Sequence, residues 1–116
     1  MKYIFILILL VQIQTLSSQQ ILEDHPLSKT IEETSGLEII DNMFITHNYS
    51  GGEPALYYLD KEGKIVDTRK ITGVKNNDWE DVTRDDEFIY VANMGNNFDT
   101  RKNLSIIKIP IKKSLN

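Results

Sequence analysis

Short apolar runs alternate with clusters of Gly, Asn, Asp and Ser along the chain from about residue 33 onward. Runs of this length that are rich in β-branched and aromatic side chains and bounded by turn residues are typical of β-strands. No helical periodicity is present after residue 18. The sequence therefore predicts an all-β fold, with strands at residues 37–40, 43–47, 55–59, 64–71, 79–84, 88–92 and 104–109.

This pattern repeats once, at an offset of 45 residues. The alignment pairs residues 33–37 with 78–82, 43–45 with 88–90 and, after an insertion of five residues in the second copy, 55–60 with 105–110. A period of about 40 to 50 residues made of short strands indicates the blades of a β-propeller. We therefore expect four-stranded antiparallel sheets arranged as propeller blades.

Residues 33–116 supply one complete blade and a second blade that lacks its outer strand. A propeller needs about four to eight blades to close. An open flank rich in Leu and Ile would also be left on the second blade, which favours aggregation. We expect an incomplete ring: either the chain is a fragment of a longer propeller, or several copies assemble. Remaining blades or other copies are the partners that this fold implies.

The N-terminal residues predict export. Lys2 precedes an unbroken apolar run at 3–11, and Ser17 and Ser18 offer small side chains for cleavage. The run is too short for a membrane span, which takes about 20 apolar residues. We interpret 1–18 as a signal peptide, with an uncleaved anchor as the alternative. The exported chain would be periplasmic or extracellular, without a membrane span after cleavage, and would begin with an extended leader at 19–32.

Composition narrows the classes of function. The chain has no cysteine, which excludes a disulfide framework and a thiolate zinc site. Its net charge is −4, and no basic cluster stands out. We therefore expect no nucleic acid as a partner.

Three carboxylates surround one tryptophan at residues 78–81, where the second blade begins. Glu80 and Asp81 are candidate ligands of a hard cation such as Ca²⁺, which prefers several oxygen ligands. The alternative is that Trp79 packs between the blades while the acids accept hydrogen bonds from turn amides.

Asparagines follow the second strand of each copy. Asn48 follows His47 in the first copy, and Asn93 and Asn96 lie in the corresponding loop of the second. These four residues are candidates for binding a small-molecule or protein ligand at the blade loops. The alternative is that the asparagines cap turns, as asparagine commonly does, and that His47 has a structural hydrogen bond. Arg101 is either an anion clamp or a solvated loop charge.

Four motifs together carry a resemblance to a known group: residues 33–37, His47-Asn48 with Ser50-Gly51, residues 78–81 and residues 95–97. They resemble the opening blades of secreted bacterial six-bladed propellers. The group includes the SdiA-regulated proteins, the esterase-like phytases and, more distantly, gluconolactonase-type and NHL propellers. The resemblance covers about residues 32–110 and implies a ring of which this chain would form about one third. Related sequences often have an aspartate where this chain has Tyr49 and Asn93, so two carboxylates are missing here.

The sequence predicts an exported propeller module that binds a ligand or partner without catalysis. The alternative is a Ca²⁺-dependent hydrolase of a lactone or phosphoester. In that mechanism Glu80 and Asp81 would hold the metal, Asn48 and Asn96 would orient the substrate, and the metal would activate water.

Overall fold

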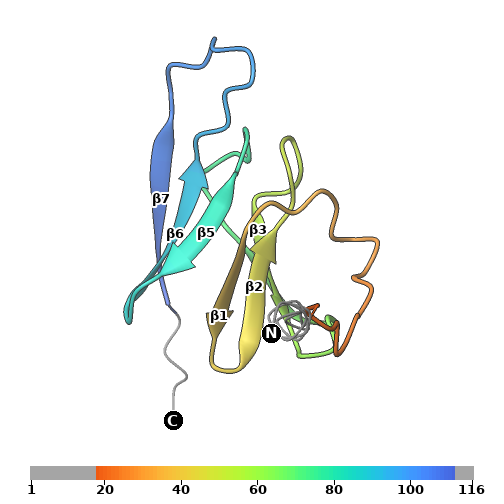
Figure 1. Cartoon of the computed structure of the whole chain (residues 1–116). Coiled ribbons are helices and arrows are strands. Elements are labelled where there is room, and N and C mark those ends of the chain that lie inside the picture. The colour runs from red at the N-terminus through yellow and green to blue at the C-terminus, as the bar shows by residue number, and fades with distance from the viewer. Residues whose placement is uncertain (1–17, 112–116) are drawn as a thin grey trace, which may run out of the picture.

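Seven β-strands and no helix make up the part of the chain that the structure, a computed structural model, describes: residues 18–111 (Figure 1). The strands are β1 (Leu37–Ile40), β2 (Met43–His47), β3 (Ala55–Leu59), β4 (Ile65–Lys70), β5 (Asp81–Arg84), β6 (Phe88–Asn93) and β7 (Ser105–Pro110). These bounds agree with the predicted strands to within two residues. The all-β prediction is confirmed for the described residues.

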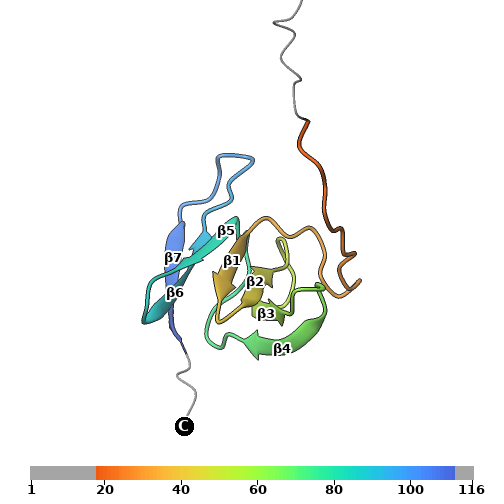
Figure 2. The same ribbon diagram turned by 60° about the horizontal axis from the view of Figure 1, so that its bottom comes forward.

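The strands form two antiparallel sheets in which each strand pairs with its neighbour along the chain. The first sheet has the order β1-β2-β3-β4 and the second the order β5-β6-β7. Figure 2 shows the two sheets beside each other, with β1 and β5 adjacent. The described residues form no closed ring, and the assignment of the sheets to propeller blades stays a prediction.

Backbone conformation explains the residues found in the tight turns. Asp41 and Asn42 both have positive φ, 47° and 62°, in the turn between β1 and β2. Two consecutive positive φ angles give the turn whose twist matches that of a two-stranded hairpin. In the β3–β4 turn Gly63 has φ 77°, and the Asp60 carboxylate accepts hydrogen bonds from the Glu62 and Lys64 amides at 3.0 and 2.9 Å.

Apolar side chains of both sheets meet in one core between them. Its buried members are Ile40, Ile45, Leu56, Trp79, Val82, Ile89, Val91 and Ile109. Trp79, the largest fully buried side chain, comes from the connection between the sheets. Full burial of one large apolar side chain contributes about 1.5–3 kcal/mol. Burial of these side chains is therefore the main contribution that holds the two sheets together.

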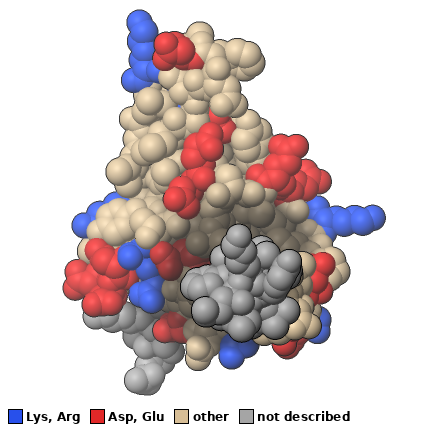
Figure 3. Space-filling view, viewed as in Figure 1, with Lys and Arg blue, Asp and Glu red and all other residues tan. Residues whose placement is uncertain are grey.

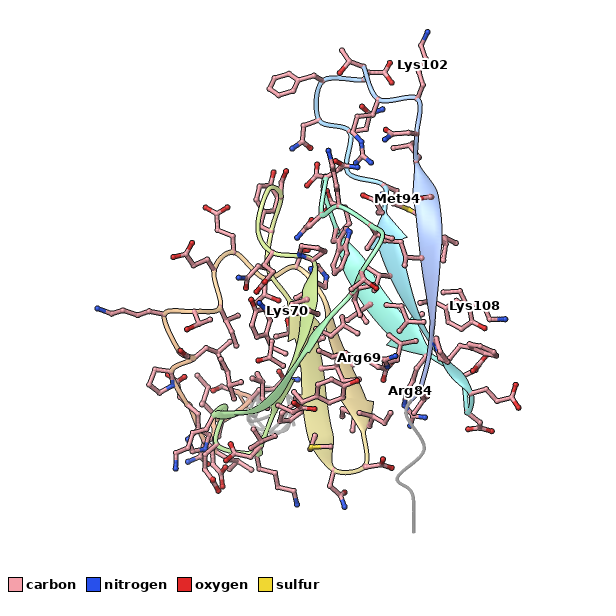
Figure 4. The ribbon with its side chains drawn as sticks, turned by 180° about the vertical axis from the view of Figure 1, so that it is seen from behind. Arg69, Lys70, Arg84, Met94, Lys102 and Lys108 are labelled. Carbon is pink, nitrogen blue, oxygen red and sulfur yellow. The ribbon has the colours of Figure 1, made fainter. Side chains whose placement is uncertain are left out.

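Polar contacts across the sheets add to the core. Thr83 Oγ1 donates to Glu38 Oε2 at 3.0 Å, and Arg84 Nε donates to the Ile39 carbonyl at 2.7 Å. Arg69 Nη1 reaches from β4 to the Pro110 carbonyl at the end of β7, at 2.7 Å (Figure 4). The two hydrogen bonds between β1 and β5, Thr83–Glu38 and Arg84–Ile39, each join residues 45 positions apart, which is the offset of the sequence alignment.

A smaller apolar cluster lies on the opposite face of the four-stranded sheet. Ala55, Tyr57 and Leu59 of β3 pack there with Ile31.

Residues 18–28 contain neither helix nor strand. The predicted signal peptide lies outside the described residues except for Ser18. Within residues 18–111 no helix is long and apolar enough to cross a membrane.

Candidate functional site

Three loops gather at one end of the two sheets, the upper end in Figure 1. They are the loop after β2, the connection between the sheets and the loop after β6. Asn76, in the connection, is buried and holds the first two together. Its Nδ2 donates to the carbonyls of Asn48 and Tyr49 at 2.8 and 3.0 Å, while its Oδ1 accepts from the Trp79 amide at 3.2 Å. Ser50 Oγ adds a bond to the Asn77 carbonyl at 2.7 Å.

The loop after β6 joins this group through main-chain and side-chain contacts. The Gly95 amide donates to the Asp78 carbonyl at 3.1 Å, and Asn97 Nδ2 donates to the Tyr49 hydroxyl at 3.4 Å. The three loops enclose a hollow of about 220 Å³. Most of the residues that line it are of polar type: Tyr49, Ser50, Asn77, Asp78, Gly95, Asn96, Asn97, Phe98, Thr100 and Arg101.

Asp78 is the least satisfied polar residue of this hollow. The residue is only 7 % exposed, and its buried Oδ1 has no hydrogen-bond partner among the described residues. A buried acceptor without a partner costs about 1–3 kcal/mol. Asp78 thus holds a buried carboxylate oxygen that a bound water, a ligand or a cation would satisfy.

The carboxylate of Glu80 lies close to that of Asp78. A Cβ placed on Gly95 would overlap with the Asp78 carboxylate and with Glu80 Oε1, so both groups lie directly over the glycine. Only a residue without a side chain leaves room for two carboxylates at this position. Gly95 therefore forms the floor of a two-carboxylate cradle beside the hollow.

Arg101 holds the loop after β6 in shape. Its guanidinium donates to the Gly95 carbonyl at 2.5 Å and to Asn93 Oδ1 at 3.2 Å. Its own amide donates to Asn96 Oδ1 at 2.8 Å. The sequence suggested either an anion clamp or a solvated charge. Arg101 has neither role, because its guanidinium donates hydrogen bonds to oxygens of its own loop.

His47 lies below the loops, fully buried beside Trp79, with ring centroids 5.9 Å apart. Nδ1 lies 3.1 Å from the Asn48 carbonyl, whereas Nε2 has no partner among the described residues. Burial lowers the pKa of His47, and the Asn48 carbonyl and the carboxylates of Asp81 and Glu80 oppose this shift. His47 is therefore held inside the protein, between Trp79 and the loop backbone.

The side chains of the other predicted residues, Asn48, Asn93 and Asp81, each form hydrogen bonds within the protein. Asn48 Oδ1 accepts from the Glu32 amide at 3.1 Å, and Asn93 Nδ2 donates to Ser105 Oγ at 3.2 Å. Both are bonds to residues distant in the chain, 16 and 12 positions away, so neither asparagine caps its own turn through them. Asp81 is exposed, and its Oδ1 accepts from the Val82 amide at 2.8 Å.

Asn96 lines the hollow and Glu80 forms the cradle. Asn93 lies outside the hollow and is linked to Asn96 through Arg101, which bonds to both side chains. Asp81 is directed elsewhere, to the face of the second sheet that bears Ala92 and Ile106.

Sequence reasoning noted Asp78 as an acid but did not single it out, and it missed Asn76 and Gly95. The glycine in the loop was the one available signal for the cradle.

In the described residues no group of three or more His, Asp or Glu side chains is placed to hold a metal ion. A cation at the two carboxylates would need backbone, amide or water oxygens as further ligands.

A wider hollow of about 630 Å³ lies on the other side of the loop after β2, beside Glu32 and Glu33. It shares Tyr49 and Ser50 with the smaller one. On the face in Figure 3 the Lys and Arg side chains are dispersed, and carboxylates lie near its centre. We place the candidate site at the smaller hollow because the unsatisfied Asp78 carboxylate adjoins it.

Comparisons with protein-family models, curated proteins and solved structures find no match for this chain. The propeller resemblance therefore stays a prediction.

Proposed function

We propose that the chain is an exported β-propeller-type module that binds a ligand at the loop hollow without catalysis, and that Asp78 and Glu80 hold a hard cation such as Ca²⁺ beside it. The observation that carries this proposal is the buried, unpartnered Asp78 Oδ1 next to a second carboxylate. The signal pattern at residues 1–18 supports export, and the two meander sheets are compatible with blades.

The chemistry of the cradle favours Ca²⁺ over an organic ligand at this point. Two carboxylates over one glycine repel each other, and burial removes the water that would screen them. Ca²⁺ accepts carboxylate, carbonyl and amide oxygens in flexible geometry, about six to eight in all. The neighbouring loops offer carbonyl oxygens, and waters would complete the shell. Such an ion would also link the connection between the sheets to the loop after β6, which keeps the hollow in shape.

The test is thermal unfolding of the purified protein with Ca²⁺ or with a chelator. A ligand that binds only the folded state stabilises it by about 2.7 kcal/mol at 100 times its Kd. We expect Ca²⁺ to raise the Tm of the wild type and not that of Glu80→Gln. Glu62→Gln removes a carboxylate from an exposed turn of the first sheet and should respond like the wild type. Equal Ca²⁺ responses in wild type and Glu80→Gln would show that the pair holds no cation.

The Ca²⁺-dependent hydrolase remains the second proposal, because the same carboxylate pair adjoins an open polar hollow. There the metal would activate water, and Asn96 would orient a lactone or phosphoester. A purified protein that hydrolyses a lactone or p-nitrophenyl phosphate with Ca²⁺, and loses this activity in Glu80→Gln, would favour the enzyme. Ca²⁺ binding without turnover would favour the binding module.

A further inference from the structure

We propose that a second copy of this chain docks head to tail, the exposed face of its four-stranded sheet covering the exposed face of the three-stranded sheet. The exposed face of the three-stranded sheet is called the leading face and is defined by Thr83, Tyr90, Ala92 and Ile106. The exposed face of the four-stranded sheet is called the trailing face and is defined by Leu37, Ile39 and Phe44.

The leading face is apolar around Ile106, and it also bears two exposed charged residues, Asp81 beside Ala92 and Lys108 beside Tyr90. The strand register sets Thr83 opposite Tyr90, and Ala92 opposite Ile106, on the side of the sheet away from the core. Ile106 is 64 % exposed, and a hollow of about 90 Å³ lies among these side chains. A β-branched side chain beside an open hollow is a surface with which another apolar side chain can interlock.

The trailing face has the same character. Leu37 is 61 % and Ile39 55 % exposed, and the register sets Ile39 opposite Phe44. Ile31 covers another part of this sheet, over Tyr57 and Leu59. The part left open is therefore the β1–β2 side, next to the place where β1 already contacts β5.

The 45-residue alignment shows why these two faces suit each other. In the first sheet, Ile45 and Leu56 pack toward the second sheet. Their counterparts in the second sheet, at offsets of 45 and 50 residues, are Tyr90 and Ile106 of the leading face. The face of the first sheet that packs against the second sheet is therefore equivalent, in the alignment, to the leading face of the second sheet.

The converse correspondence also holds. Val82 and Ile89 of the second sheet pack toward the first, and their counterparts at the same offset are Leu37 and Phe44 of the trailing face. Docking the trailing face of one copy on the leading face of another would therefore repeat the interface between the two sheets of one chain. The occupant is a second copy because its trailing face continues that interface.

This contact joins two different faces, so it is heterologous and leaves one free face at each end of a pair. Repetition would give a ring or an open chain of copies. If a closed ring contains about four to eight sheets, it would hold about two to four copies.

The test is molar mass in solution, measured by light scattering after size exclusion over a range of protein concentrations. The wild type should exceed the mass of one copy, and more so at higher concentration. Ile106→Lys blocks the leading face, Leu37→Lys blocks the trailing face, and each variant alone should be a monomer. Their equimolar mixture should form a complex of two copies, because one intact face of each kind remains.

Leu22→Lys is the matched control, since Leu22 is 87 % exposed in the segment before the first sheet and belongs to neither face. It should assemble like the wild type. Ile106→Ser replaces Ile106→Lys if the lysine variant loses its sharp thermal transition. A wild type that is monomeric at every concentration, a mixture that stays monomeric, or a control that loses assembly would each overturn the proposal.

Discussion

Replacing Asp78 by asparagine should stabilise the calcium-free protein, although it removes a charged group from the candidate site. The wild-type carboxylate is buried with Oδ1 unpartnered, and it shares the space over Gly95 with Glu80 Oε1. Asparagine has nearly the same shape. Its Nδ2, placed where Oδ2 now lies, would donate to the Glu80 carboxylate instead of repelling it.

The size of the effect follows from these groups. The buried Oδ1 stays unpartnered in asparagine and makes no difference between the two proteins, whereas a new hydrogen bond to the charged Glu80 carboxylate contributes about 1.5–3 kcal/mol. The second amide hydrogen of asparagine has no evident partner and offsets part of the gain. We expect a net stabilisation of about 1–2 kcal/mol, which for a domain of this size raises Tm by about 5–10 °C.

The order of stability should reverse when Ca²⁺ is added. At 100 times Kd, Ca²⁺ stabilises the wild type by about 2.7 kcal/mol, which exceeds the gain from asparagine, whereas Asp78→Asn should not respond. Thermal or urea unfolding followed by circular dichroism, with a chelator and with Ca²⁺, measures both effects. Asp86→Asn, at an exposed turn residue, controls for the loss of one negative charge.

Two results would refute this reasoning. If Asp78→Asn is less stable than the wild type in chelator, the buried oxygen already has a partner that the amide cannot replace. If Asp78→Asn and the wild type gain equally from Ca²⁺, the cation binds elsewhere.

Two further predictions concern the region below the loops. Because burial lowers the pKa of His47 below its usual 6.5, the unfolded chain binds the proton more readily. Stability should therefore be complete above about pH 6.5 and decline below it by up to about 1.4 kcal/mol per pH unit. Denaturant unfolding between pH 5 and 7 checks this, with a flatter profile in His47→Gln and an unchanged one in His25→Gln. Gly36→Ala should destabilise by about 1–3 kcal/mol, since its Cβ would lie 2.7 Å from the Val82 amide nitrogen. Gly52→Ala, with nearest neighbours at 3.2 Å or more, should cost less in the same thermal melts.

The strands could be predicted because their causes are local. A run of β-branched and aromatic residues prefers the extended backbone, and a turn such as Asp41-Asn42 needs residues that tolerate positive φ within a few positions. Both conditions are visible in short stretches of sequence. Glu80 could be named as a candidate because three carboxylates stand within four residues of the chain.

The partners of the site residues depend on groups far apart in the chain. Asn76 contacts a loop that lies 27 and 28 residues earlier, and Gly95 lies under a carboxylate from the connection between the sheets. Sequence therefore located the loops but not the cradle, and it did not separate Asp78 from Asp81.

The sequence by itself determined the all-β class, the strand positions and the turns, because backbone preference and hydrophobic alternation act within a few residues. Only the tertiary structure decided which polar atoms lose contact with water: His47 Nε2 and Asp78 Oδ1 are buried without partners, while Asp81 stays exposed. The reason is that desolvation depends on how the two sheets and three loops pack together. Neighbouring residues of one type can therefore differ completely in what they are able to bind.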